Sequence, residues 1–218
     1  SDLSKLKKRE PYLSLKSGKC SPNAVVLMPQ LPKGTWGEYK ASLKDLIDHV
    51  AEEQNCDVKR VSITGHSLGA NGTLDILLAH PDFFSAASVL SPCKDIGDKM
   101  KQISHVPIWF LAGAKENNYR KYAISMHDRL KNLGGETKLT LVPGYGHPIQ
   151  LTWVSDEYQM FDWLASYRLD RFIVDVSKHQ GKINWDRLAP HLVFCIIKAS
   201  GLYGNGADPY YAYNVEGA

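Results

Sequence analysis

Short apolar runs alternate with segments of helical periodicity over most of residues 1–168. A continuous apolar run bounded by turn residues is typical of a strand buried on both faces of a parallel sheet, whereas apolar residues at every third or fourth position indicate a helix. The predicted strands cover residues 23–28, 60–64, 86–90, 107–112 and 137–142, and the predicted helices cover residues 36–54, 71–80, 122–133 and 154–167. This alternation predicts a mostly parallel, doubly wound α/β sheet.

The pattern changes near residue 169. Residues 171–177 predict a strand that delivers Asp175 near its end, and residues 192–199 predict a second buried strand. A short helix around Trp185 separates the two strands, and residues 208–214 open a further helix. Strands and helices in this order, with polar groups at the strand ends, are typical of the first two β/α units of a (β/α) barrel.

Length and composition agree with one domain and part of a second, which we expect to cover residues 1–168 and 169–218. The chain has 218 residues, of which 44% are hydrophobic and 22% charged, enough for one sizeable core and part of a second. Its formal net charge of +3 is too small to favour a nucleic-acid partner. We expect no membrane insertion, because no apolar run approaches spanning length, and no signal peptide is visible.

The four cysteines are far apart and have no C-x-x-C spacing, so the sequence predicts neither a metal site nor a disulfide framework. Buried free thiols are the preferred interpretation.

A G-x-S-x-G motif at residues 65–69 lies between a predicted strand and a predicted helix. In this context it predicts a nucleophile elbow, in which Ser67 stands on a sharp turn with its hydroxyl above the sheet. Gly65 and Gly69 would allow a close approach of strand and helix, and the N–H of Leu68 would stabilise an oxyanion. The alternative is a tight turn with an idle serine.

Two further loops carry candidate catalytic groups. Glu116 follows the predicted strand that ends at residue 112, and His147 follows the one that ends at residue 142. Nucleophile, acid and base thus occur in the chain order of a doubly wound hydrolase. Ser67 would attack an acyl carbon, His147 would transfer the proton, and Glu116 would orient the imidazole.

Each partner of Ser67 has alternatives. His66 is expected to pack beside the site rather than act as the base. Three aspartates compete with Glu116 for the role of the acid, although none directly follows a strand: Asp95, Asp98 and Asp128.

Residues 1–168 resemble the α/β-hydrolase esterases of the polyhydroxybutyrate-depolymerase-like and acetyl or feruloyl esterase group. The shared features are Met28-Pro29-Gln30 with Trp36, the 65–69 motif, the 113–116 acid loop and Gly146-His147. The resemblance implies hydrolysis of small acyl esters without a cofactor. Family members begin with further strands and an H-G-x-G-type loop that gives the second oxyanion donor. We therefore expect an esterase domain that is incomplete at its N-terminus, and a missing donor would cost about 3–4 kcal/mol of transition-state stabilisation.

Residues 169–218 resemble the opening of the glycoside hydrolase family 25 lysozymes. The shared motifs are D-V-S-x-H-Q-G-x-I-x-W at 175–185, I-I-K-A-S at 196–200 and D-x-x-Y-x-x-N at 208–214. The resemblance implies muramidase activity, with Asp175 as an active-site carboxylate and with Gln180 and Asp208 as substrate-binding residues.

The family's D-x-E motif, which carries the general acid, is expected beyond this segment. The segment would then be incomplete at its C-terminus and could not work alone as a glycosidase, because that chemistry uses two carboxylates. The alternative for Asp175 is a plain residue at a strand end.

Together these features favour a serine carboxylesterase with a Ser-His-Glu triad, within a longer cell-wall or polysaccharide-degrading hydrolase that also has a muramidase domain. We expect an ester-bearing carbohydrate or small acyl ester as substrate, with peptidoglycan as a candidate, and by resemblance a secreted or cell-envelope location. Two alternatives stay open. One is a peptidoglycan lysozyme with a vestigial esterase part, and the other is a non-catalytic binding or structural module.

Overall fold

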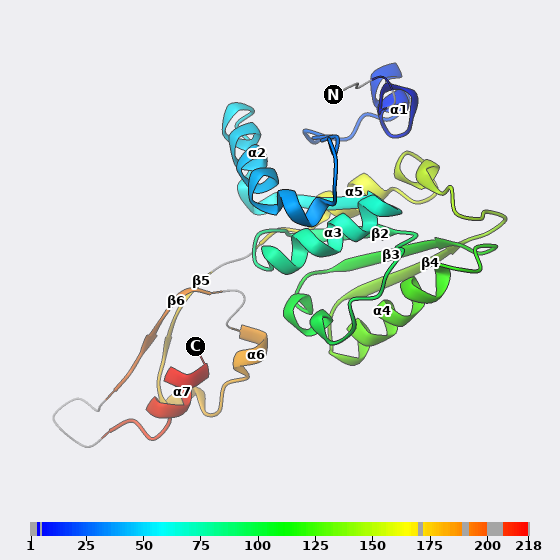
Figure 1. Cartoon of the computed structure of the whole chain (residues 1–218). Coiled ribbons are helices and arrows are strands. Elements are labelled where there is room, and N and C mark those ends of the chain that lie inside the picture. Colours follow the sequence, from blue (N-terminus) through cyan, green and yellow to red (C-terminus); the bar gives the residue numbers. More distant parts are fainter. Residues whose placement is uncertain (1–3, 5, 170–171, 189–191, 200–206, 218) are drawn as a thin grey trace. The chain divides into compact units, whose positions relative to one another are not determined.

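The computed structural model describes the chain apart from residues 1–3, 5, 170–171, 189–191, 200–206 and 218. The chain divides into two compact units, Ser1–Arg168 and Leu169–Ala218 (Figure 1). Each unit is described separately below.

A parallel sheet forms the centre of the first unit. Among its described residues, four strands lie in the order β1 (Ser62–His66), β2 (Ala86–Leu90), β3 (Ile108–Gly113) and β4 (Thr137–Val142). Each strand pairs in parallel with the next, so the parallel α/β sheet predicted from the alternating pattern is confirmed. Every residue of β2 and β3 is buried, as expected for central strands covered on both faces.

Helices connect and flank these strands (Figure 1). Along the first unit they are η1 (Leu6–Lys8), α1 (Tyr12–Ser17), η2 (Trp36–Tyr39), α2 (Lys40–Glu53), η3 (Val58–Arg60), α3 (Leu68–Ala79), η4 (Gly97–Ile103), α4 (Arg120–Asn132), η5 (Gln150–Trp153) and α5 (Met160–Ser166). The η elements are 3₁₀ helices. No helix within the described ranges combines the length and the apolar character that a membrane crossing requires.

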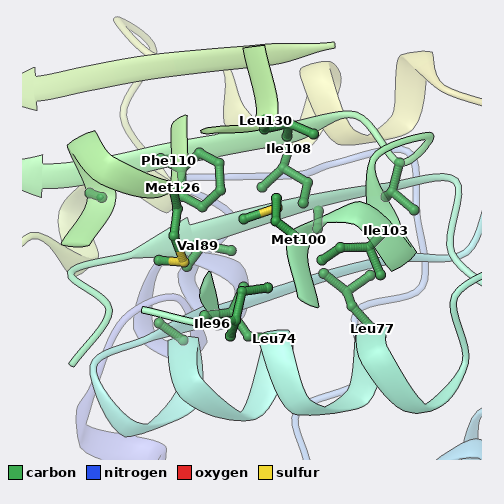
Figure 2. Packing of buried hydrophobic residues seen from close by; sticks show 14 of the residues in the cluster. Leu74, Leu77, Val89, Ile96, Met100, Ile103, Ile108, Phe110, Met126 and Leu130 are labelled. Atoms are coloured by element: carbon green, nitrogen blue, oxygen red, sulfur yellow. The ribbon is translucent and has the colours of Figure 1, made fainter. Parts of the chain in front are cut away.

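The larger hydrophobic core lies between one face of the sheet and α3, η4 and α4 (Figure 2). Alternate residues of the central strands point into it, among them Val89 of β2 and Ile108 of β3. The helices contribute Leu74, Met100 and Leu130, which are fully buried. Apolar residues at alternate strand positions therefore pack against apolar residues on one side of each flanking helix, all on the same face of the sheet.

A second, smaller core covers the opposite face. The other set of strand residues, including Leu90 and Trp109, packs there against Met160 and Leu164 of α5. The indole N–H of Trp109 donates to Oγ1 of Thr140 at 3.0 Å, which satisfies the one polar atom of this buried side chain. Both faces of the sheet are therefore covered, but α3, η4 and α4, which lie between β1 and β4 in the chain, all pack on one face, so the doubly wound arrangement stays a prediction.

Two predicted elements of the first unit are wrong. Residues 23–28 form neither strand nor helix, and Val25 is 51% exposed, because an apolar run becomes a strand only where a neighbouring strand accepts its hydrogen bonds. The helix predicted over 154–167 is confined to α5, because Gln159 adopts a left-handed conformation with φ of 48° just before it.

The second unit contains a parallel pair, β5 (Phe172–Val176) and β6 (Leu192–Ile197), as its sequence pattern predicts. Its described helices are η6 (Lys178–Gln180), α6 (Trp185–Leu188) and α7 (Tyr211–Gly217). The buried indole of Trp185 donates to Oδ1 of Asn214 at 3.2 Å and so joins α6 to α7. The barrel itself stays a prediction.

Core packing around α4 gives a direct test of this fold. Leu130→Ala is expected to lower the free energy of unfolding by about 2–5 kcal/mol, because it empties a fully buried position between helix and sheet. Leu133→Ala, at the end of the same helix and 43% exposed, is the matched control and should change stability by less than about 1 kcal/mol. Urea denaturation of both variants measures the difference, and equal effects would contradict the assigned packing.

Candidate active site

Ser67 stands between the end of β1 and the start of α3. Its backbone has φ of 58° and ψ of −118°, a conformation that costs a non-glycine residue about 1–3 kcal/mol. Hydrogen bonds hold it on both sides: the N–H of Ser67 donates to the Leu90 carbonyl at 2.9 Å, and the N–H of Asn71 donates to the Ser67 carbonyl at 3.1 Å. This is the strained strand-to-helix turn of a nucleophile elbow.

The two glycines of the motif have different roles. A Cβ at Gly65 would lie 2.2 Å from the carbonyl oxygen of Gly69, so strand and helix approach too closely there for any side chain. A Cβ at Gly69 would meet nothing within 4 Å. The expectation that both glycines are needed for close approach is therefore right for Gly65 and wrong for Gly69.

His147 links the serine to a buried acid. Its Nε2 lies 2.8 Å from Oγ of Ser67, and its Nδ1 lies 2.5 Å from Oε1 of Glu116. With the ring proton on Nδ1, the imidazole donates to the Glu116 carboxylate and accepts from the Ser67 hydroxyl. The structure thus brings together the three residues that the sequence analysis singled out.

Glu116 is itself held by a residue that the sequence analysis missed. Its carboxylate is 5% exposed, and Oε2 accepts a hydrogen bond from the Ser91 hydroxyl at 2.8 Å. Ser91 is fully buried, has φ of 45° and directly follows β2. Its place after a buried strand, at the edge where the other candidates lie, was the signal that could have identified it.

Close backbone contacts bring together the loop that carries Glu116 (the acid loop) and the loop that carries His147 (the base loop). The N–H of Lys115 donates to the Tyr145 carbonyl at 2.8 Å. A Cβ at Gly113 would lie 1.9 Å from the carbonyl oxygen of Gly146, so the loops pack backbone against backbone. Glu116 and His147 are therefore positioned by the chain on either side of them.

The three competing aspartates lie in other surroundings. Asp95 accepts from the N–H of Gly97 at 2.8 Å, Asp98 pairs with Arg129 at 3.1 Å on the surface, and Asp128 is exposed on α4. Among the four candidate acids, the hydrogen bond to His147 belongs to Glu116.

Other groups surround the serine. Leu68 is the first residue of α3, where backbone N–H groups lack partners within the helix, so it is suitably placed to donate to an oxyanion. Sγ of Cys93 lies 3.6 Å from Oγ of Ser67, and the ring of Tyr119 lies 5.2 Å from that of His147. The sequence analysis named neither residue as part of the site. All four cysteines are free and partly exposed, so the expectation of buried thiols is wrong.

The predicted site residues of the second unit lie around the end of β5. Asp175 is exposed, and Oε1 of Gln180 accepts from the N–H and hydroxyl of Ser177 at 2.8 and 3.2 Å. The carboxylate of Asp208 is buried and accepts backbone N–H groups from Lys178 at 2.7 Å and Tyr210 at 2.9 Å.

The bonds to Asp208 determine its charge state. Burial alone would raise the pKa of this carboxyl, but the two backbone donors and the charges of Lys198 and Lys178 lower it below its ordinary value. Asp208 thus stays ionised, and its carboxylate links the backbone at Lys178 to the backbone at Tyr210. The roles in substrate binding and catalysis assigned to these residues by resemblance stay predictions.

No group of three or more metal-ligating side chains occurs within the part of the chain that the structure describes. The arrangement around Ser67 is suited to nucleophilic acyl transfer.

One of three similar solved structures, a thermostable esterase, supports the α/β-hydrolase fold. This esterase has a TM-score of 0.51 at 23% identity over 58% of this chain and 36% of that chain, so this chain spans little more than a third of that esterase. Arabidopsis thaliana SOBER1 has a TM-score of 0.47 at 21% identity, over 59% of this chain and 62% of that chain. A Mesorhizobium loti carboxylesterase has a TM-score of 0.47 at 18% identity, over 63% and 71%. No curated protein matches the chain significantly.

A family model defines the wider group. Residues 33–146 match Peptidase S9, the prolyl oligopeptidase family. The matched segment includes Ser67 and Glu116 and ends one residue before His147. This family differs from the esterase group to which the sequence was likened, although the α/β-hydrolase assignment itself is supported. Because the match covers more than half of its residues, the chain belongs to the prolyl oligopeptidase family.

Proposed function

We propose that the first unit is a serine hydrolase that cleaves small acyl esters through Ser67, His147 and Glu116. The observation that carries the proposal is the unbroken line of hydrogen bonds from Ser67 through His147 to Glu116 and Ser91. Nucleophile, base and acid are each within hydrogen-bonding distance of the next before any substrate binds, which is the arrangement that acyl transfer requires.

The reaction begins at the Ser67 hydroxyl. Oγ forms a bond to the acyl carbon while its proton passes to Nε2 of His147, and the carbonyl oxygen becomes an oxyanion. The N–H of Leu68 is the proposed donor to this oxyanion, since it lies at the N-terminus of α3. Collapse of the intermediate breaks the ester bond, and the leaving alcohol takes the proton from His147.

A water molecule then completes the cycle. His147 removes a proton from the water, the resulting hydroxide attacks the acyl-serine, and Ser67 leaves with the proton that His147 returns. Throughout, Glu116 holds the ring proton at Nδ1 and stabilises the imidazolium. Ser91 donates to the far oxygen of Glu116, which keeps the near oxygen directed at His147.

Peptide-bond cleavage is a second candidate, and the match to the prolyl oligopeptidase family over residues 33–146 favours it. The same residues can serve both reactions, because His147 can protonate an amine as well as an alcohol. A matched pair of substrates, one ester and one amide with the same acyl group, distinguishes the two. Hydrolysis of the amide at a rate comparable to the ester would favour a peptidase.

We propose that the second unit contributes Asp175 to the cleavage of peptidoglycan glycan chains by a longer protein, as the D-V-S-x-H-Q-G motif suggests, with the second carboxylate expected outside this segment. The parallel β5–β6 pair and the exposed carboxylate of Asp175 near the end of β5 support this proposal. In that case the whole protein would act at the cell envelope or outside the cell. An esterase that removes O-acetyl groups from muramic acid would then prepare the substrate for the neighbouring glycosidase.

Ser67→Ala is expected to abolish labelling by a fluorophosphonate probe and to lower kcat for p-nitrophenyl acetate by about 10⁴-fold or more, because it removes the hydroxyl that would form the acyl-enzyme. Ser21→Ala, an exposed serine in a loop of the same unit, should label like the wild type. Labelling and initial rates measure both effects. Labelling that persists in Ser67→Ala, or a folded wild type that fails to label, would overturn the proposed nucleophile.

Glu116→Gln is expected to lower kcat by about 10²–10⁴-fold, because the amide cannot stabilise the imidazolium or hold its tautomer. Ser91→Ala should lower it by about tenfold, since it removes one hydrogen bond to a charged group. Asp98→Asn replaces the exposed ion-pair partner of Arg129. It is the control and should leave kcat unchanged. Steady-state kinetics checks all three, and a Glu116→Gln variant with wild-type kcat would contradict the assigned acid.

Acetate release tests the proposed substrate. Incubation with O-acetylated peptidoglycan should release acetate in the wild type and not in Ser67→Ala, because only the wild type can attack the acetyl carbon. Good activity on feruloyl or xylan acetate esters without acetate release from peptidoglycan would refute the muramic-acid substrate. It would leave the serine hydrolase proposal standing.

A further inference from the structure

The side chain next to the nucleophile holds the base loop from both of its ring nitrogens. His66 is the last residue of β1, directly before Ser67. Its Nε2 lies 2.8 Å from the carbonyl oxygen of His147, and its Nδ1 lies 3.1 Å from Nε2 of Gln150. A neutral ring with its proton on Nε2 satisfies both contacts, since it donates to the carbonyl and accepts from the amide.

Packing fixes this ring in place. The His66 ring lies 4.8 Å from the ring of His147 and meets Trp153 edge-on, with centroids 6.5 Å apart. The Trp153 indole N–H in turn donates to Oγ1 of Thr64 at 2.8 Å. Two residues of β1, Thr64 and His66, thus hold the segment that carries His147.

We propose that His66 is a positioning residue, an inference that rests on the proposed serine hydrolase function. Its neutral imidazole holds the main chain of His147 where Nε2 of that residue can take the proton of Ser67. The link is short: one residue, adjacent in sequence to the nucleophile, binds the backbone of the base. A shift of this carbonyl would move the base relative to the serine, and acyl transfer is sensitive to such displacements.

The surroundings of His66 favour its neutral form. Burial is the main cause that lowers its pKa below the ordinary value, and positive charge on His147 and Arg9 acts in the same direction. The His147 carbonyl and the Glu116 carboxylate oppose this shift without reversing it. Protonation would direct a new N–H at the amide donor of Gln150 and add a charge beside His147.

This arrangement has a kinetic consequence at low pH. Protonation of His147 removes the base. Protonated His66 would keep its Nε2–H bond to the His147 carbonyl, but the new N–H on Nδ1 would face the amide donor of Gln150 and disturb the segment that carries the base. The logarithm of kcat/KM should therefore fall more steeply at the acid end of the wild-type profile than a single protonation allows. A purely structural residue whose charge is irrelevant would leave a slope of about one.

His66→Gln and His66→Leu test the positioning role. His66→Gln keeps an N–H donor for the His147 carbonyl but cannot titrate, so kcat should stay within about threefold of the wild type and the acid slope should become about one. His66→Leu removes the donor and should lower kcat by about tenfold or more with little change in KM. A His66→Leu variant that folds and keeps wild-type kcat would overturn the inference.

Gln150→Glu gives a second test that does not require replacing His66. A carboxylate facing Nδ1 favours protonated His66, so the midpoint of the acid limb should move upward by about one pH unit. Gln102→Glu, on an exposed position of η4, is the control for the added charge and should not move it. The shift should be smaller in the double variant His66→Gln/Gln150→Glu, where only the direct effect of the carboxylate on the base remains, and an undiminished shift would refute the role of His66.

Labelling of wild-type Ser67 distinguishes a failure of the serine hydrolase proposal from a failure of the positioning role of His66. Without labelling of the folded wild type, the proposed function itself fails. With labelling, and with the same acid slope in wild type and His66→Gln, the serine hydrolase proposal stands and the positioning role of His66 fails. Thermal unfolding of each variant establishes that the compared proteins are folded.

Discussion

Parallel pairing of β1 to β4 places the carboxyl ends of all four strands at one edge of the sheet. The register aligns His66 with Leu90 and, one strand further, Leu90 with Leu111. The residues that follow these positions are Ser67 and Ser91, and the loops after β3 and β4 carry Glu116 and His147. Four segments far apart in sequence therefore meet because backbone hydrogen bonds hold their strands side by side.

The two strand-end serines share an unusual backbone. Ser67 and Ser91 both have positive φ, and each donates its N–H to a carbonyl of the next strand, Leu90 for Ser67 and Leu111 for Ser91. Each conformation costs about 1–3 kcal/mol, so the ladder of the sheet and the buried surroundings must offset it. The turned backbones aim one hydroxyl at His147 and the other at Glu116, and the proposed chemistry depends on both directions.

The second unit uses its polar residues differently in the part that the structure describes. The carboxylate of Asp208 and the side-chain carbonyl of Gln180 accept hydrogen bonds from backbone N–H groups. The indole N–H of Trp185 donates to Asn214. Tyr213 likewise donates to the Ile183 carbonyl at 2.5 Å. Several residues of the lysozyme-like motifs thus hold loops around β5 and β6, whereas Asp175 stays exposed near the end of its strand.

The sequence by itself determined the alternation of strands and helices in the first unit, the elbow at Ser67 and the choice of Glu116 and His147. Each of these depends on local signals: periodicity, flanking glycines and position after a strand. Only the tertiary structure decided that residues 23–28 form no strand and that Ser91 and Cys93 lie at the site. It also decided that His66 contacts the base loop through both ring nitrogens. Those outcomes depend on which distant segment lies opposite a residue, and the local pattern of a single sequence does not specify that segment. The position of Ser91 after a predicted strand indicates the right edge of the sheet but not the contact with Glu116.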